Sequence, residues 1–144
     1  MQQEHDMNAP QDEVTASYHR CRADDSFFDT FYDDFLAKSP EIAEKFRQTD
    51  FAHQKLMLRE SLLEMLCFEQ GMDGARAEIK LLGRRHKDLR ITSAMYGMWM
   101  DSLCEAVAQH DPQYTPELAQ KWRDAMRPGI DLMISESDPN VEGS

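Results

Sequence analysis

The chain has 144 residues and a formal net charge of −11 at neutral pH. This length suits one domain with a single hydrophobic core, and an acidic surface repels phosphate backbones and anionic lipids, so we expect neither a nucleic-acid nor a membrane partner. No apolar stretch approaches the roughly 18 residues that span a bilayer, and residues 1–10 are polar and unlike a secretory signal. We therefore expect a cytoplasmic protein.

Apolar residues recur at helical spacing along the chain, whereas no stretch alternates apolar and polar residues as a strand does. Leu, Met and Ala are also commoner than the β-branched residues Val and Ile, which favour strands. These patterns predict an all-α fold with about seven to eight helices. The helices read from the sequence cover about residues 12–23, 27–36, 40–46, 51–70, 75–87, 93–110 and 116–135.

Short polar side chains indicate where four of these helices begin. Ser39-Pro40 combines a capping hydroxyl with a proline that fits the first turn, where its missing N–H is not needed. Thr49-Asp50 and Thr92-Ser93 offer similar caps, and Asp24-Asp25-Ser26 supplies capping side chains for the second helix. These sites predict the starts of the helices more sharply than periodicity does.

The two ends of the chain and one dipeptide interrupt the helical pattern. Residues 1–12 and 136–144 lack periodicity, so we expect disordered tails around a single domain of residues 13–135. Pro128-Gly129 lies inside the last predicted helix. A proline there removes a backbone donor and clashes with the preceding turn, so we expect a kink or a locally loosened segment.

The sequence lacks the common catalytic and metal-binding motifs. It has no Gly-rich phosphate loop, zinc-spaced Cys/His cluster, Gly-x-Ser-x-Gly elbow or His-Glu-x-x-His pair. Its three cysteines are widely spaced within apolar segments, which favours reduced, buried thiols. These absences are compatible with a domain of many helices that encloses a cofactor.

One short segment in the middle of the chain holds the residue types that a haem pocket needs. A haem requires a neutral imidazole for its iron, a dry apolar slot for the porphyrin and cations for its propionates. The segment supplies these as His86, as Leu82 with Ile91, and as Arg85 with Arg90.

Two stretches resemble the single-domain bacterial haemoglobins, which are globins. The run from Thr30 to Ile42, followed by Lys45-Phe46, is similar to their second and third helices, including the proline between them. Leu82-Gly83-Arg84-Arg85-His86 resembles their proximal-histidine segment, and Tyr96 falls where such globins often carry a tyrosine on the next helix. The likeness covers about residues 16–135.

The resemblance implies a globin fold that holds haem b. It implies that His86 ligates the iron, that Phe46 stacks on the porphyrin and that Tyr32 projects toward the bound gas. The other residues expected around the haem are Leu58, Leu82, Arg85, Arg90, Ile91, Tyr96 and Trp99. Relatives can place a glutamate of the last helix near the proximal histidine, but alignment here puts Ser137 at that position and Glu136 one residue away, so no such role is assigned.

The long helix should supply the residue beside the bound gas, and His53 and Gln54 are adjacent candidates. The histidine shares its face with Met57, Glu60 and Glu64, so turning it to the haem would bury two unpaired carboxylates. The glutamine shares its face with apolar residues and one hydroxyl, namely Phe51, Leu58, Ser61, Leu62 and Met65. We therefore predict Gln54 as the distal residue and His53 as a solvent-side histidine.

The predicted function is reversible binding of O₂ or another diatomic gas, such as NO or CO, at a histidine-ligated haem. The Tyr32 O–H and the Gln54 N–H would donate hydrogen bonds to the partial negative charge on the gas. Three alternatives are an NO dioxygenase that depends on a separate reductase, a gas-sensing or redox-sensing globin that acts through a protein partner, and a haem-free interaction module. No residue is assigned a catalytic role, and a monomer and a homodimer both fit the sequence.

Overall fold

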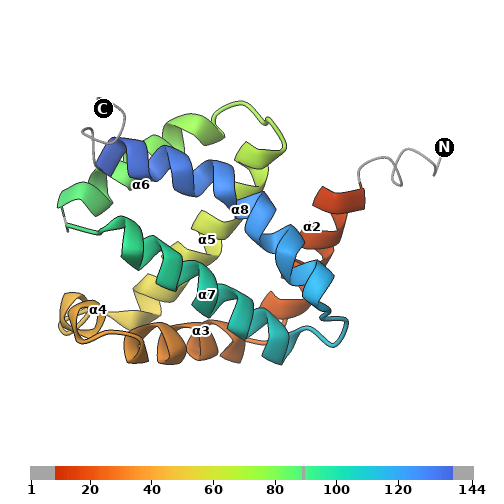
Figure 1. Ribbon diagram of the computed structural model, residues 1–144, viewed down its shortest axis with the longest axis horizontal. Coiled ribbons are helices and arrows are strands. Elements are labelled where there is room, and N and C mark those ends of the chain that lie inside the picture. The colour runs from red at the N-terminus through yellow and green to blue at the C-terminus, as the bar shows by residue number, and fades with distance from the viewer. Residues whose placement is uncertain (1–8, 89, 138–144) are drawn as a thin grey trace.

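The computed structural model describes residues 9–88 and 90–137, and this part of the chain is helical without any strand. Its helices are α2 (Ala9–Arg22), α3 (Ser26–Ala37), α4 (Pro40–Lys45), α5 (Phe51–Glu69), α6 (Ala75–Asp88), α7 (Ser93–His110) and α8 (Pro116–Ser137). Figure 1 shows α6 and α8 together on one side and α3 and α7 on the other, with α5 passing behind α7. The all-α prediction is confirmed, and each expected helix is present within a few residues of its predicted limits.

Side-chain caps explain where three of the helices begin. The Ser39 hydroxyl accepts a hydrogen bond from the Glu41 N–H at 3.1 Å, directly before the proline that opens α4. Asp50 accepts from two backbone N–H groups in the first turn of α5. The Thr92 hydroxyl accepts from the Met95 N–H at 3.2 Å and so caps α7. These caps confirm the predicted starts, because each satisfies donors that a helix leaves without partners.

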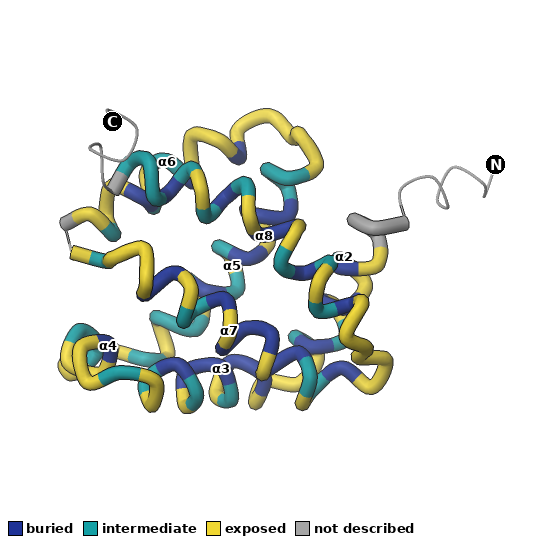
Figure 2. The backbone as a smooth tube through the Cα atoms, in the orientation of Figure 1, coloured by how far each residue is buried: buried dark blue, intermediate teal, exposed yellow. Residues whose placement is uncertain are grey.

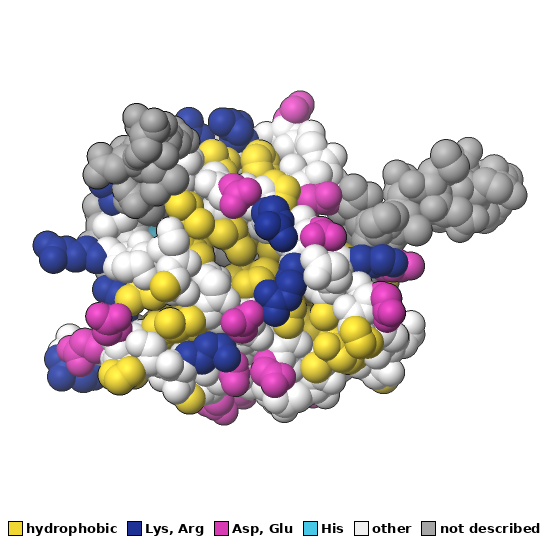
Figure 3. Space-filling model, viewed as in Figure 1, with side chains coloured by type: hydrophobic (Ala, Val, Ile, Leu, Met, Phe, Trp, Pro, Cys, Tyr) yellow, Lys and Arg dark blue, Asp and Glu magenta, His cyan; other side chains and the backbone are white. Residues whose placement is uncertain are grey.

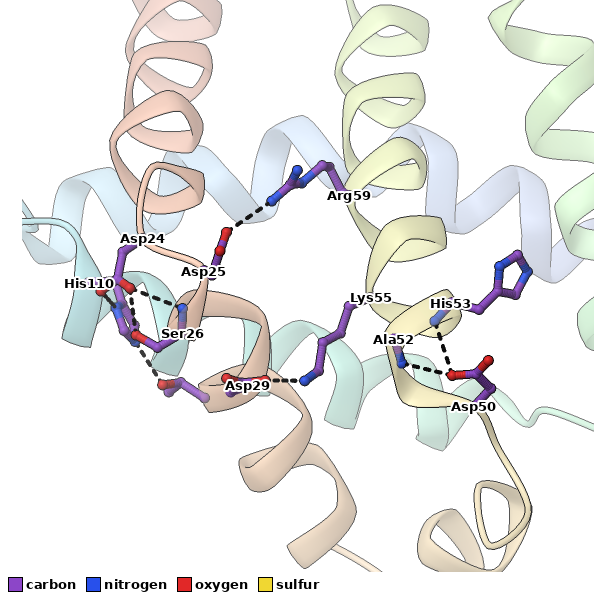
Figure 4. A network of polar contacts seen from close by, with 11 residues as sticks. Asp24, Asp25, Ser26, Asp29, Asp50, Ala52, His53, Lys55, Arg59 and His110 are labelled. Carbon is purple, nitrogen blue, oxygen red and sulfur yellow. Dashed lines mark hydrogen bonds and ion pairs between the residues drawn. The ribbon is translucent and has the colours of Figure 1, made fainter.

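The start of α3 differs from its prediction in one respect. Asp25 precedes the helix without a capping bond, and it is Asp24 that accepts from the N–H and the hydroxyl of Ser26, at 3.0 and 2.7 Å. The same carboxylate lies 3.2 Å from Nδ1 of His110, whose Nε2 lies 2.7 Å from the Thr30 hydroxyl. Figure 4 shows this cluster where the end of α7 meets the start of α3. It joins the two helices at their ends.

Each helix turns one apolar face inward, as the dark blue segments in Figure 2 show. The face of α3 is aromatic and buries Phe27, Phe28, Phe31, Tyr32 and Phe35. On the other side of the molecule Trp122 of α8 lies edge-on to Tyr18 of α2, with ring centroids 6.2 Å apart and both side chains almost fully buried. The aromatic face of α3 leads from this core toward α4 and α5.

Gly83 allows α6 and α8 to pack closely. A Cβ atom at this position would lie 2.9 Å from the Met133 Cα and 3.1 Å from the Glu136 Cβ, which is too close for any side chain. Only glycine therefore fits this crossing. The crossing holds the helix that carries His86 against α8.

The prediction that Pro128-Gly129 would interrupt the last helix is only partly met. α8 runs without a break from Pro116 to Ser137 with the proline inside it. Figure 1 shows the ribbon changing direction along its length, as expected where a proline removes one backbone donor. Gly129 is buried, and a Cβ there would lie 3.1 Å from the side chain of Met65, so packing against α5 covers this part of the helix.

A buried carboxylate ties α2, α7 and α8 together. Asp111, at the end of α7, has a side chain with no exposed surface. It accepts hydrogen bonds from the Ser17 hydroxyl at 2.5 Å and from the guanidinium of Arg20 at 2.7 and 2.9 Å. The Gln113 N–H donates to the same carboxylate, and the Trp122 indole N–H donates to the Ser17 hydroxyl at 3.0 Å. We call these five residues the Asp111 corner.

The helices extend beyond the predicted domain limits at both ends. Residues 9–12 belong to α2 and residues 136–137 to α8. The remainder of the predicted disordered tails, residues 1–8 and 138–144, lies outside the described residues. None of the described helices combines the length and the apolar character needed to cross a membrane.

Candidate functional site

One cavity of about 210 Å³ lies among α3, α4, α5, α6, α7 and α8. Figure 3 shows a hollow bordered by apolar side chains on the face formed by α7 and α8. Most of the cavity wall is apolar. The lining residues are Tyr32, Phe35, Ile42, Lys45, Phe46, Gln54, Met57, Leu58, Ser61, Met65, Leu82, Arg85, His86, Ile91, Met95, Tyr96, Trp99 and Met133.

The structure brings nearly all of the residues predicted from the sequence to this cavity. Those that line it are Tyr32, Phe46, Gln54, Leu58, Leu82, Arg85, His86, Ile91, Tyr96 and Trp99. Arg90 does not line it. Its side chain is exposed, and its backbone adopts a left-handed φ of 60° in the connection between α6 and α7. The ten lining residues therefore share one space, and their contacts with a haem stay predictions.

The backbone of α6 orients His86. Its Nδ1 lies 2.7 Å from the Leu82 carbonyl oxygen one turn earlier, so Nδ1 carries the proton and donates it. That leaves the Nε2 lone pair available to a metal. Burial lowers the pKa of His86 below its ordinary value, and the bond to the carbonyl offsets only part of this effect. The imidazole is therefore held in the neutral form that ligates iron.

Tyr96 is close to His86, whereas Glu136 is engaged elsewhere on α6. The Tyr96 ring lies with its centroid 5.9 Å from that of the imidazole. Glu136, the glutamate nearest the position discussed for related proteins, instead pairs with Arg84 at 3.2 Å and Lys80 at 3.7 Å. The side chain of Ser137 lies outside the described residues. The one hydrogen bond described for the imidazole is to a backbone carbonyl.

Tyr32 and Gln54 form a polar pair within the apolar wall. Tyr32 is 5% exposed, and burial raises its pKa to about 12, while a hydrogen bond from the Gln54 side chain offsets part of that effect. The phenol therefore keeps its proton at any physiological pH. The pair supplies an O–H and an N–H donor group to a space that otherwise contains few polar atoms.

The choice between the two adjacent candidates on α5 agrees with the geometry. Gln54 lines the cavity, whereas His53 is exposed and does not. Figure 4 shows His53 projecting from the first turn of α5 on the side away from α3, with only its backbone N–H bonded to Asp50. Helical spacing was less accurate for Met57, which was grouped with His53 but lines the cavity. The cavity therefore covers a wider stripe of α5 than expected.

Aromatic side chains close the end of the cavity near α4. Phe46 follows the last turn of α4, and its ring lies 5.8 Å from Tyr32, 6.1 Å from Phe35 and 5.9 Å from Phe51 between centroids. Tyr32 and Phe51 also meet at 5.4 Å. Mutual contacts among these rings hold Phe46 in place, so it presents an apolar surface to whatever occupies the cavity.

Sequence reasoning missed several lining residues. Lys45 adds a second cation to that of Arg85, and it could have been found because it directly precedes Phe46 in the quoted motif. Met95 and Met133 come from α7 and α8, and no local pattern distinguishes them from ordinary core methionines. Among the described residues there is no group of three or more His, Cys, Asp or Glu side chains that could hold a metal ion. A metal at His86 would therefore need ligands from a cofactor.

No protein-family model and no curated protein sequence matches this chain. A search of solved structures found a protein of Pseudomonas aeruginosa PAO1 whose crystal structure is highly homologous to a human haemoglobin. The two chains are 38% identical, and the match covers 89% of this chain and 98% of the other with a TM-score of 0.85. The chain belongs to the globin family. This globin thus has the fold expected from the resemblance of its Tyr32 and His86 segments to bacterial haemoglobins.

The cavity of this globin fits a haem by its chemistry. A neutral imidazole with a free Nε2 comes from α6, apolar and aromatic side chains form the walls, and the cations Lys45 and Arg85 also line the space. These are the residue types that a haem needs, namely a neutral nitrogen ligand, an apolar slot and cations for the propionates.

Proposed function

We propose that this globin binds haem b in the cavity, with His86 Nε2 as the iron ligand, and that it binds O₂ reversibly. The observation that carries this proposal is a neutral imidazole, fixed by the 2.7 Å contact between its Nδ1 and the Leu82 carbonyl oxygen, on the wall of a largely apolar cavity of about 210 Å³. When bound, the haem would supply a ferrous iron to which O₂ or another diatomic gas, such as NO or CO, attaches.

Each of the other residues that line the cavity would have its own role toward the haem or the bound gas. Phe46 and Leu58 exclude water and so oppose oxidation of the iron. Tyr32 and Gln54 would donate hydrogen bonds to the partially negative gas, each contributing about 1–2 kcal/mol in such a dry site. Arg85 would neutralise a propionate at the cavity wall. Arg90 is exposed and outside the lining, so it would reach a propionate only outside the cavity.

An absorption spectrum tests the ligand assignment. We expect purified protein supplied with haemin to show a Soret band, His86→Gly to lose it, and added imidazole to restore it by replacing the missing ring. His53→Gly is the matched control, because it removes an exposed histidine from the neighbouring helix and should leave the spectrum unchanged. A protein that stays colourless after haem supplementation would contradict the proposal, as would loss of the band in the control alone.

A further inference from the structure

Phe51, the first residue of α5, contacts two residues of the cavity wall without lining the cavity itself. Its ring centroid lies 5.4 Å from that of Tyr32 and 5.9 Å from that of Phe46. Both partners line the cavity, whereas Phe51 is absent from the described residues that do so. A change at this position would therefore act on a bound haem or gas through the rings that Phe51 touches.

The start of α5 fixes where the Phe51 ring lies. Asp50 precedes it and accepts hydrogen bonds from the Ala52 N–H and the His53 N–H, at 3.1 and 3.4 Å. Figure 4 shows both bonds at the first turn of the helix. Such a cap holds the first turn in helical form, and the Phe51 ring is half-buried. The ring is thus carried by a firmly capped segment of backbone.

Helix α5 holds Tyr32 at two points. Residues three apart are neighbours on a helix surface, and Phe51 and Gln54 have this spacing. The phenylalanine contacts the phenol ring, and the glutamine side chain hydrogen-bonds to the phenol oxygen. The ring contact limits how far the phenol can tilt, and the hydrogen bond limits where its oxygen lies. Together they set the direction in which the Tyr32 O–H points.

Tyr32 needs support on this side because it lines a cavity. Phe31, which contacts its ring at 4.9 Å, is the preceding residue of the same helix, so it cannot hold α5 and the phenol in register. A shorter aliphatic side chain in place of Phe51 would leave space into which the phenol could tilt. Hydrogen bonds weaken steeply as the angle at the hydrogen decreases, so a small tilt would reduce what Tyr32 donates.

We propose that Phe51 is a positioning residue for gas binding, which holds the Tyr32 ring so that the Tyr32 O–H points at the gas on the haem iron. The inference rests on the proposed function, since it assumes haem at His86 and the gas beside Tyr32. Phe51 contacts the phenol and does not contact the gas. Its effect on the gas should therefore vanish when the Tyr32 hydroxyl is removed.

The first test measures O₂ dissociation by stopped-flow displacement with CO, with and without that hydroxyl. We expect Phe51→Leu to speed dissociation about threefold, since an aromatic contact of ordinary strength is lost. In the Tyr32→Phe background the same substitution should change the rate less than about 1.5-fold. A general loosening of the cavity would speed dissociation equally in both backgrounds and would overturn the proposal. A wild-type rate in Tyr32→Phe alone would also overturn it.

The second test measures the mobility of the Tyr32 ring and needs no gas kinetics. Relaxation of ¹³C-labelled tyrosine rings gives an order parameter for each ring, and the signal that Tyr32→Phe removes belongs to Tyr32. We expect Phe51→Leu to lower this order parameter in the haem-free protein and in the CO complex. An unchanged order parameter in both states would show that Phe51 does not hold the ring.

Phe27→Leu is the matched control. Phe27 is a fully buried ring that contacts Phe28 on α3 and is outside the described cavity lining. It should leave the O₂ rate within about 1.5-fold of wild type and the Tyr32 order parameter unchanged, although it removes at least as much buried surface. Equal acceleration by Phe27→Leu and Phe51→Leu would overturn the proposal.

A second variant covers the case in which Phe51→Leu does not retain haem. Phe51→Met keeps the side chain long and apolar but replaces the flat ring with a flexible one, and the same results are expected. The Soret band is recorded on every sample. A haem-loaded protein whose O₂ rate does not respond to Phe51 therefore contradicts only this inference, whereas a wild type without a Soret band contradicts the proposed function.

Discussion

The Asp111 corner and the cavity both draw polar side chains from several helices into the interior, yet they are completed differently. In the corner, the carboxylate receives donors from Ser17, Arg20 and Gln113, and the chain itself supplies every partner. In the cavity, Nδ1 of His86 donates to a backbone carbonyl, and no other hydrogen bond of this side chain is described. The corner is closed by residues of this protein, whereas the cavity leaves Nε2 of His86 for the haem that we propose.

This difference implies that the Asp111 corner mainly affects stability, whereas the cavity mainly affects ligand binding. A buried carboxylate with all its hydrogen bonds made is costly to disturb, because removing it leaves a charged guanidinium without its partner. The residues that line the cavity of about 210 Å³ have few packing partners on the side that faces it. Changes in the corner should therefore alter unfolding without altering ligand chemistry, and most changes in the cavity should do the reverse.

The largest expected effect comes from the corner. Asp111→Ala removes a fully buried carboxylate and leaves Arg20 unpaired, so we expect the free energy of unfolding to fall by about 3–5 kcal/mol in urea titrations. Asp101→Ala is the control, since this residue pairs with Arg123 at the surface and should cost less than about 1 kcal/mol. Equal losses in the two variants would remove the distinction between the corner and an ordinary surface ion pair.

A smaller effect is expected at the crossing of α6 and α8. Gly83→Ala places a Cβ 2.9 Å from the Met133 Cα, so the helices must separate at a cost of about 1–3 kcal/mol. The helix that carries His86 would shift, and haem should dissociate faster in a transfer assay to an apoglobin acceptor. Gly97→Ala has nothing within 4 Å of the new Cβ and should stabilise α7 by up to about 1 kcal/mol. Faster haem loss from both variants would argue against a role for the crossing.

The distal pair should affect the gas and leave the fold nearly unchanged. Gln54→Leu removes a donor from the cavity, and we expect O₂ to dissociate about tenfold faster, equivalent to about 1.4 kcal/mol, by stopped-flow displacement with CO. His53→Leu changes the exposed neighbour on α5 and should leave the rate within about twofold. The reverse result would show that the exposed histidine reaches the bound gas.

The smallest effects are in the pH dependence of the haem-free protein. The pKa of His86 is lowered by burial from its ordinary 6.5, so below about that pH the unfolded chain binds more protons and the free energy of unfolding decreases. Burial alone would raise the pKa of Asp111, but hydrogen bonds from Arg20 and Ser17 hold it below 3.8, so its contribution is present above that pH and lost on further acidification. Urea titrations should show that His86→Gln flattens the first decrease and Asp111→Asn the second. If neither variant changed how the free energy of unfolding depends on pH, the assignment of these two pH ranges to His86 and Asp111 would be wrong.

The sequence predicted the features that depend on local chemistry. Ser39, Asp50 and Thr92 cap their helices because a short polar side chain needs only the next turn as its partner. Helical period separated Gln54 from His53, because burying Glu60 or Glu64 would have been costly. The segment around His86 correctly placed Leu82, Arg85 and Ile91 at the cavity, since these residues are close in sequence.

Features that depend on distant contacts could not be predicted in this way. Asp111 directly follows a predicted helix, and no local pattern reveals its partners Ser17 and Arg20, which lie more than ninety positions earlier. The need for glycine at position 83 depends on Met133, which no spacing within α6 reveals. Pro128 was expected to kink or loosen the last helix, and α8 changes direction but continues to Ser137, where Gly129 packs on Met65 of a distant helix.

We propose above that the cavity holds one haem on His86. Titration of the haem-free protein with haemin, followed by absorbance in the Soret region, tests it most directly. We expect a linear rise that breaks at one equivalent in the wild type and in His53→Gly, and no break in His86→Gly. A curve without a break in the wild type, with the spectrum of free haemin throughout, would contradict it.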